Sequence, residues 1–213
     1  CEINEIFLKL YKKYSPGPIS YILKLKKNSL ISKNVTNKKN TLAVRFPKHQ
    51  LTRNLLKRLN YPLAAPSANI STKISPVSKK DVKDEFGKKI RFILDGGQSR
   101  IGVESTIVNL INKPKILRLG GIPREEIRKY LDSHLVYQKK SKMVSPGQGK
   151  THYSPYIKLR LNITKPKKNE AFILIKKRKK LCKNYFYLSK KKNLKEAAKN
   201  LYKTLRIIKK MKF

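Results

Sequence analysis

Eight polar side chains lie at the ends of predicted strands or in the loops beside them, and their types suit the binding of a small polar ligand. They are Thr41, Arg45, Ser67, Asn69, Ser75, Ser105, Thr106 and Arg118. Ligand sites of open α/β sheets form at such positions, because strand ends expose backbone groups and loops direct side chains into a crevice. Each residue alone also has an ordinary role, since Ser and Asn cap helices and fill turns. The pattern predicts a binding crevice and leaves its ligand open.

The segment 64–76, AAPSANISTKISP, supplies three of these residues. It is too polar for a core strand and too rich in β-branched residues and proline for a helix, so we interpret it as a loop. Pro66 restricts Ala65 to an extended conformation. The loop then offers the hydroxyl and amide groups of Ser67, Asn69 and Ser75 from one stretch of chain.

Three other kinds of site find little support in the sequence. His49, His134 and His152 are dispersed and have no partner at metal-ligand spacing, so no metal site built from protein ligands is expected. The run 149–151 resembles the end of a Walker A motif, but Val144 stands where that motif needs glycine. No serine lies in a G-x-S-x-G elbow, which disfavours a hydrolase with a serine nucleophile.

Apolar spacing and turn residues predict helices that alternate with strands. The predicted helices are 2–13, 51–59, 78–86, 123–131 and 193–208. The predicted strands are 19–25, 41–46, 90–94, 105–111, 116–118, 171–175 and 185–188, with a loop at 26–40 and a turn at 95–97. Ser78 is a predicted N-cap and Gly87 a helix terminator. This alternation indicates an α/β fold with a mixed sheet.

The last helix has its own signals. Asn193 is placed to cap it, and Glu196 is placed to complete a capping box. Its predicted apolar face consists of Leu194, Ala198, Leu201, Leu205 and Ile208.

We expect a first domain over 1–137, a linker over 138–158, and part of a second small α/β domain over 159–213. The start at Cys1 and the abrupt end at Phe213 suggest truncation at both ends. The sequence contains no apolar run of about 18 residues, so it does not predict a membrane span. Cys1 and Cys182 lie far apart, which disfavours a disulfide framework and fits a reducing cytoplasm.

The formal charge of +41 invites a nucleic-acid partner, because cationic surfaces bind phosphate with release of counterions. Of the 53 basic residues, however, 42 are Lys and only 11 are Arg. Arginine is the usual residue for two-pronged recognition of phosphates and bases. An excess of lysine spread along the chain, together with many Asn and Ile, indicates A/T-rich codons more than a binding patch.

The order of several motifs resembles a known family. The motifs are SPGPIS (15–20), NTLAVRFP (40–47), APSANIS (65–71), ILDGGQSRIGVESTIVNL (93–110), ILRLGG (116–121) and SPGQGKTHYSP (145–155). In this order they closely resemble the YrdC-like threonylcarbamoyl-AMP synthases, and S-x-N, E-S-T-I-V and H-Y-S-P together are specific. The linker and the β-α unit after it resemble the longer, two-domain type. The resemblance implies a YrdC-like twisted mixed sheet with helices, followed by a linker and part of a small Rossmann-like domain.

The same resemblance implies a nucleotidyltransferase that forms L-threonylcarbamoyl-AMP from L-threonine, bicarbonate and ATP, with release of pyrophosphate. The product serves threonylcarbamoyladenosine formation next to the anticodon, so tRNA or the tRNA threonylcarbamoyl-transferase complex is an implied partner. A carbamate oxygen attacks the α-phosphorus, so no enzyme nucleophile is needed. Mg²⁺ on the phosphates is the implied metal.

Matching positions imply the site residues. Arg45, Ala65 through its backbone, and Ser105 correspond to threonine contacts, and the ATP contacts correspond to Thr41, Ser67, Asn69, Ser75, Arg118 and Tyr153. Tyr153 lies in the linker, which the resemblance implies is a lid. A K-x-R motif and further threonine-binding segments of the family would lie before Cys1, and the segment 34–40 lacks the usual glycine and leucine. We therefore expect residues 1–213 alone to fold poorly or bind weakly and to lack synthase activity, which the longer parent protein should have.

Two alternatives stay open at this point. The first is a module that binds tRNA or double-stranded RNA without catalysis, whose affinity would fall steeply with salt. The second is a relative that uses carbamoyl-AMP in carbamoyl transfer, and the segment 145–213 disfavours it because such a relative would lack this part of the chain.

Overall fold

The computed structural model describes residues 1–131, 136–137, 153–177, 182–211 and 213. The chain forms two compact units. The first unit consists of Cys1–Pro66 and Glu104–Gly149, and the second consists of Ser67–Val103 and Lys150–Phe213.

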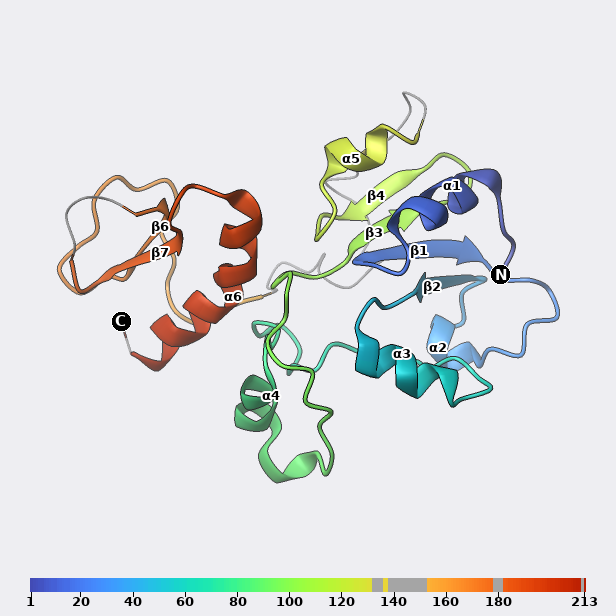
Figure 1. Ribbon diagram of the computed structural model, residues 1–213, viewed down its shortest axis with the longest axis horizontal. Coiled ribbons are helices and arrows are strands. Elements are labelled where there is room, and N and C mark those ends of the chain that lie inside the picture. Colours follow the sequence, from blue (N-terminus) through green and yellow to red (C-terminus); the bar gives the residue numbers. More distant parts are fainter. Residues whose placement is uncertain (132–135, 138–152, 178–181, 212) are drawn as a thin grey trace. The chain divides into compact units, whose positions relative to one another are not determined.

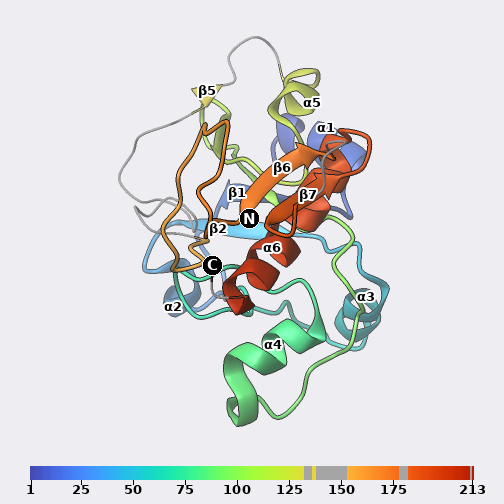
Figure 2. The same ribbon diagram turned by 90° about the vertical axis from the view of Figure 1, so that its left-hand side faces the viewer.

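The first unit is built on a five-stranded mixed sheet with the strand order β2-β1-β3-β4-β5. Figure 1 labels β1 to β4, and Figure 2 labels β5. Its strands are β1 (Ile19–Lys24), β2 (Thr41–Arg45), β3 (Thr106–Asn109), β4 (Lys115–Arg118) and β5 (Val136–Tyr137). β1 is antiparallel to β2 and parallel to β3, β3 is antiparallel to β4, and β4 is parallel to β5. The predicted α/β class with a mixed sheet is confirmed.

The two faces of this sheet bury different sets of residues, because successive side chains of a strand point to opposite faces. One face carries Tyr21 and Val108 and packs against Leu10 of helix α1 (Glu5–Tyr14) and Ile127 of helix α5 (Arg124–Arg128). The other face carries a smaller cluster of Ile22, Ile107 and Leu117. The remaining helices of this unit are α2 (Lys33–Thr36) and α3 (Gln50–Lys57), and α3 buries none of its residues.

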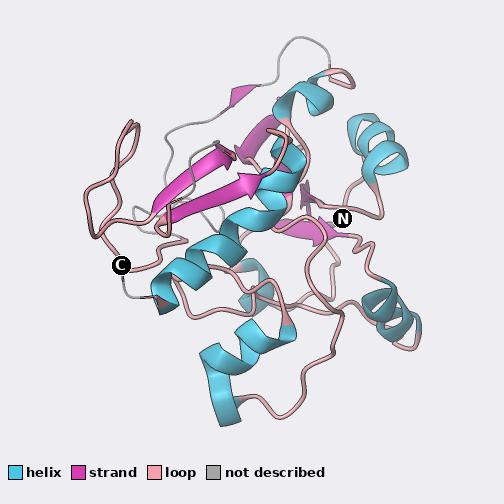
Figure 3. Ribbon diagram, turned by 60° about the vertical axis from the view of Figure 1, so that its left-hand side comes forward, coloured by secondary structure: helices cyan, strands magenta, loops and turns pink. Residues whose placement is uncertain are grey.

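The second unit contains helix α4 (Lys79–Phe86), the 3₁₀ turn η1 (Gly87–Lys89), strands β6 (Phe172–Lys176) and β7 (Tyr185–Ser189), and helix α6 (Leu194–Lys210). β6 and β7 are parallel, and α6 runs beside this pair in both rotated views (Figure 2, Figure 3). A parallel pair of strands with a following helix matches the predicted β-α unit. A small core of Ile74, Val77 and Tyr202 joins α6 to the segment before α4.

Capping and turn signals were largely correct. Ser78 accepts a hydrogen bond from the backbone N–H of Asp81 at the start of α4. Gly87 ends that helix with φ of 54°, a conformation that glycine adopts without steric cost. The carboxylate of Asp95 accepts from the Gly97 N–H at 3.0 Å, which forms the predicted turn.

Several element predictions were wrong. The strand expected at 90–94 is absent from this described segment, where Phe92 and Leu94 are 89% and 66% exposed. A short apolar run does not by itself specify a strand, and this one finds no pairing partner. The expected loop 26–40 contains the one-turn helix α2, and the helix expected over 123–131 ends at Arg128.

The start of α6 differs from a simple capping box. Asn193 Oδ1 accepts from the N–H groups of Lys195 and Glu196 as predicted. The carboxylate of Glu196 instead accepts from Ser189 Oγ, which itself accepts from Asn193 N. Ser189 therefore relays the expected contact between Glu196 and the cap.

The predicted apolar face of α6 was partly wrong. Leu194 is 68% exposed, and the buried positions are Ala197, Tyr202, Thr204 and Ile208. The helix packs on β7 and also on Ile74 and Val77, so it buries a wider face than one apolar stripe indicates.

Candidate functional site

Strand pairing brings four polar residues of the first unit to one edge of its sheet. Arg45, the last residue of β2, lies opposite Ser20 near the start of β1. Ser105 directly precedes β3, which runs parallel to β1, and Arg118 ends the antiparallel strand β4 opposite Ile107. The four residues thus lie in, or for Ser105 directly before, four neighbouring strands in the order β2-β1-β3-β4. We call them the edge cluster.

Hydrogen bonds of ordinary length join three members of the edge cluster, Ser20, Ser105 and Arg118. The hydroxyls of Ser20 and Ser105 lie 2.8 Å apart in a buried position. The Arg118 guanidinium donates to the Ser105 carbonyl from Nε at 3.0 Å and from Nη2 at 2.9 Å, and Nη2 also reaches the Ser105 hydroxyl at 3.1 Å. Ser105 is therefore fixed from two sides, and the cation of Arg118 is fixed with it.

Arg45 adds a second cation to the same edge. Its Nε donates to the Gly17 carbonyl at 3.4 Å. Within the described part of the chain, other N–H groups of the guanidinium remain available to a ligand. Partial burial of the charged group lowers the pKa of Arg45, and the positive charge of Arg118 lowers it further. The residue stays charged, because the pKa of arginine lies far above neutrality. Two cations that repel each other beside paired hydroxyls form a place where a carboxylate or phosphate is favoured.

The segment 104–106 is held against the loop that follows β4. Thr106 Oγ1 donates to the Ile122 carbonyl at 2.7 Å and accepts from the Ile122 N–H at 3.0 Å. The Gly121 N–H donates to the Glu104 carbonyl at 2.8 Å. A Cβ on Gly120 would lie 2.4 Å from that carbonyl oxygen, so only glycine allows this approach. These contacts place Ser105 at the sheet edge.

A second group of predicted residues lies in the loop before α4. Ser67 is exposed, whereas Asn69 and Ser75 are partly buried. Asn69 Nδ2 donates to the carbonyls of Ile70 at 2.9 Å and Lys73 at 3.1 Å. Its Oδ1 is buried and has no hydrogen-bond partner among the described residues. A buried acceptor without a donor costs about 1–3 kcal/mol, so Oδ1 is a natural acceptor for a ligand or a water molecule.

Tyr153 lies beside this loop. Ser154 donates its N–H to the Thr72 carbonyl at 2.9 Å and forms a β-bridge with Lys73. The ring of Tyr153 stacks on the ring of Tyr202 in α6, with centroids 5.5 Å apart and an angle of 28° between the planes. The rest of the predicted linker, 138–152, lies outside the described residues.

The predicted site residues are divided between the units. Thr41, Arg45, Ala65, Ser105 and Arg118 belong to the first unit, and Ser67, Asn69, Ser75 and Tyr153 belong to the second. Thr41 pairs with Lys24 at the end of β2 opposite to Arg45, and Ala65 is exposed in the segment after α3. The structure gathers Arg45, Ser105 and Arg118 in one cluster and places Thr41 at the other end of β2.

Sequence reasoning missed Ser20 as a member of the site. Its signal was present, because a hydroxyl between Ile19 and Tyr21 in an otherwise apolar strand marks a position with a polar partner. The partner, Ser105, lies 85 residues away along the chain.

Within the described residues, no group of three or more His, Cys, Asp and Glu side chains is placed to hold a metal ion. A cavity of about 410 Å³ in the second unit is lined by Ser78, Lys79, Lys80, Lys83, Asp95, Gly97 and Gln98, and it includes none of the predicted site residues. In the part of the chain that the structure describes, every helix is too short or too polar to cross a membrane.

Two family models match the chain. The Sua5/YciO/YrdC model, described as "Telomere recombination", matches residues 1–120. A second model, described as the C-terminal domain of threonylcarbamoyl-AMP synthase, matches residues 122–212. The chain therefore belongs to the Sua5/YciO/YrdC family. The matches to the two family models meet near residue 121. The two compact units, in contrast, each consist of two separate stretches of the chain. The domain limits expected at 137 and 159 therefore stay a prediction.

Individual relatives agree with this assignment. A threonylcarbamoyl-AMP synthase of Pyrococcus abyssi is 41% identical over 160 residues, covering 72% of this chain and 46% of the relative. The protein of that name in Schizosaccharomyces pombe is 42% identical over 172 residues, covering 75% and 42%. The crystal structure of P. abyssi Sua5 complexed with L-threonine matches with a TM-score of 0.85 and 32% identity, covering 99% of this chain and 67% of that one. The chain thus spans about half the length of the curated relatives that it matches.

Proposed function

We propose that the protein is an L-threonylcarbamoyladenylate synthase, or the part of one that holds the threonine carboxylate and one wall of the nucleotide site. The observation that carries this proposal is the edge cluster, in which Arg45 and Arg118 flank the paired hydroxyls of Ser20 and Ser105. A planar guanidinium that offers two parallel N–H groups suits a carboxylate. The similarity to a relative whose crystal structure is a complex with L-threonine supports threonine as the ligand.

In this proposal, Arg45 binds the carboxylate of L-threonine, and Ser105 and the backbone of Ala65 complete the contact. The amine of threonine takes up CO₂ from bicarbonate as a carbamate. A carbamate oxygen then forms a bond to the α-phosphorus of ATP while the bond to pyrophosphate breaks. The protein contributes position and positive charge, which is sufficient because the nucleophile belongs to the substrate.

The nucleotide contacts are proposed for Ser67, Asn69, Ser75, Arg118 and Tyr153, together with Thr41. The buried Asn69 Oδ1 supports this assignment, since a hydroxyl or amine of the nucleotide would supply its absent donor. Tyr153, whose ring stacks on Tyr202, is the proposed nucleotide contact from the linker. The product would pass to tRNA or to the complex that modifies it.

Mg²⁺ enters this proposal through the phosphates of ATP. The ion is usually held by substrate phosphate oxygens and water, with one or two carboxylates. Among the described residues, no three or more His, Cys, Asp and Glu side chains are grouped to hold a metal. The side chains present therefore fit an ion that is held mainly by phosphate oxygens better than an ion held by the protein alone. When bound, Mg²⁺ would offset phosphate charge.

Replacing Arg45 tests the proposed function. Calorimetric titration with L-threonine should show that Arg45→Gln binds about 10–100-fold more weakly, because a hydrogen bond to a charged group contributes about 1.5–3 kcal/mol. Arg53→Gln is the matched control, since Arg53 is an exposed arginine on α3 of the same unit.

Two outcomes would contradict the proposal. The first is unchanged threonine affinity in Arg45→Gln. The second is ATP-dependent pyrophosphate release that does not depend on L-threonine, in this chain or in a longer form that contains it.

A further inference from the structure

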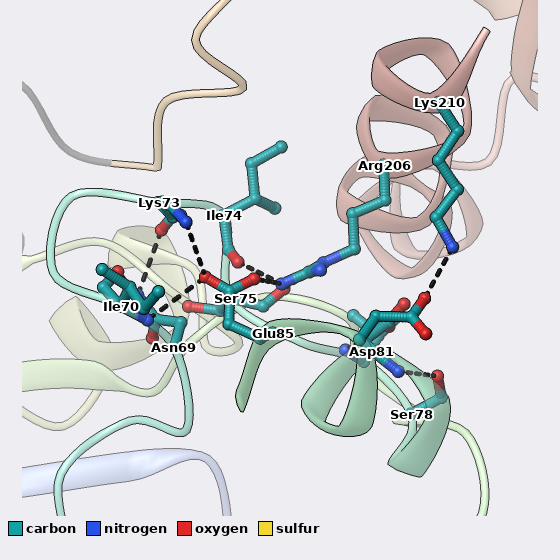
Figure 4. A network of polar contacts seen from close by, with 12 residues as sticks. Asn69, Ile70, Lys73, Ile74, Ser75, Ser78, Asp81, Glu85, Arg206 and Lys210 are labelled. Atoms are coloured by element: carbon teal, nitrogen blue, oxygen red, sulfur yellow. Dashed lines mark hydrogen bonds and ion pairs between the residues drawn. The ribbon is translucent and has the colours of Figure 1, made fainter. Parts of the chain in front are cut away.

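Arg206 of helix α6 donates hydrogen bonds to the loop 69–75, which carries the predicted nucleotide-binding residues Asn69 and Ser75 (Figure 4). Arg206 Nη2 donates to the Ile74 carbonyl at 2.5 Å, and its Nε reaches the Ser75 carbonyl at 3.4 Å. The residues lie about 130 positions apart in the chain, yet all belong to the second unit. The backbone of the loop just before α4 is thus tied to the last helix.

Glu85 of α4 extends this contact to the other end of the loop. Its carboxylate lies 3.5 Å from Arg206 Nη2 and 3.7 Å from Lys73 Nζ, and it accepts from the Ile70 N–H at 3.3 Å. The side chains of Arg206 and Glu85 are only 14% and 9% exposed, so salt screens this pair less than a surface pair.

The amide of Asn69 bonds to the same short stretch of backbone. It donates to the carbonyls of Ile70 and Lys73, whereas Arg206 and Glu85 hold the carbonyls of Ile74 and Ser75 and the N–H of Ile70. The orientation of the buried Asn69 Oδ1 therefore depends on a backbone that Arg206 and Glu85 restrain. Figure 4 shows the side chain of Arg206 extending from α6 toward Ser75 and Glu85, with Asn69 and Ile70 on the other side of them.

Apolar packing supports the same arrangement. Tyr202, one turn before Arg206 on α6, packs with Ile74 and Val77 and stacks on Tyr153. Close backbone contact continues at Gly102, where a Cβ would lie 2.3 Å from the Lys199 carbonyl oxygen. One helix thus supports both parts of the predicted nucleotide wall in this unit, the loop with Asn69 and Ser75 and the ring of Tyr153.

We propose that Arg206 is a positioning residue that, together with Glu85, orders the loop 69–75 so that Asn69 and Ser75 can bind the nucleotide. This inference rests on the proposed function and adds to it a role for α6. A planar guanidinium is required, because one group must reach two carbonyls and a carboxylate at once. Lysine at this position would satisfy only part of the set.

Hydrogen exchange tests the ordering of the loop without requiring a ligand. Peptides covering 67–76 should exchange about tenfold faster in Arg206→Ala and in Glu85→Gln, while peptides from β1 and β3 keep their rates. Arg206→Lys should restore part of the protection. Lys203→Ala is the matched control, since Lys203 is an exposed cation on α6, and it should leave the loop unchanged. Faster exchange throughout the chain would indicate general unfolding and would overturn a local role.

Titration with ATP and with L-threonine separates this inference from the proposed function. Arg206→Ala should weaken ATP binding about tenfold and leave L-threonine affinity unchanged, because Arg45 and Ser105 belong to the other unit. Unchanged ATP affinity beside faster loop exchange would overturn the positioning role and leave the proposed function standing. If a longer form that contains this chain binds neither ligand, the proposed function fails, and the exchange rates alone decide whether Arg206 orders the loop.

Discussion

Replacing Thr106 with valine isolates the hydrogen bonds that hold the segment 104–106, because the two side chains have nearly the same shape. Thr106 is fully buried, and its hydroxyl bonds to both the carbonyl and the N–H of Ile122. Valine leaves both backbone groups without this partner. Each unsatisfied buried group costs about 1–3 kcal/mol. The additional buried methyl group returns about 0.8 kcal/mol.

The expected loss in the free energy of unfolding is therefore about 3 kcal/mol. Urea denaturation followed by circular dichroism measures it, and an m-value of about 2 kcal/mol per molar would lower the midpoint by about 1.5 M. Thr106→Ser is the matched control, since it keeps the hydroxyl and removes only a methyl group, at a cost of about 1 kcal/mol. The reasoning fails if the valine variant is as stable as the serine variant, because the hydroxyl would then contribute nothing beyond its volume.

Two further predictions concern α1 and α6. Burial, and next the nearby charge of Glu126, raises the pKa of Tyr14 to about 12. Between pH 10 and 12 the unfolded chain therefore loses the phenolic proton while the folded chain keeps it. The free energy of unfolding should fall over this range. Tyr14→Phe lacks the hydrogen bond to the Glu126 carbonyl, so it should be less stable than the parent at pH 8. Urea titrations should show that the free energy of unfolding falls less between pH 8 and 11 in this variant than in the parent. An equal fall in both proteins would refute the assignment. Asn193→Ala removes the acceptor for the N–H groups of Lys195 and Glu196 and should lower the free energy of unfolding by about 1 kcal/mol, whereas Asn193→Ser should lower it little. Thermal denaturation compares the variants. Equal melting temperatures for the alanine variant and the parent would contradict the role of Asn193 as the cap.

Local signals in the sequence were sufficient for much of the fold. Apolar spacing before two prolines predicted α1, and Ser78 and Gly87 marked the ends of α4, because caps and turns depend on neighbours within a few residues. The strands that became β1 to β4 were predicted by the same kind of evidence. The segment 90–94 carried the composition of a strand without its pairing partner, and pairing is not a local property.

The sequence by itself identified Arg45, Ser105 and Arg118 as candidates, through their residue types and their places at strand ends. Only strand order and register brought them to one edge of the sheet, and only that edge revealed Ser20. The tie from Arg206 to Ile74, across 132 residues, was likewise decided by tertiary packing. Helix and strand signals reach a few residues along the chain, whereas a binding site depends on which distant surfaces bury each other, and the local pattern does not encode that choice.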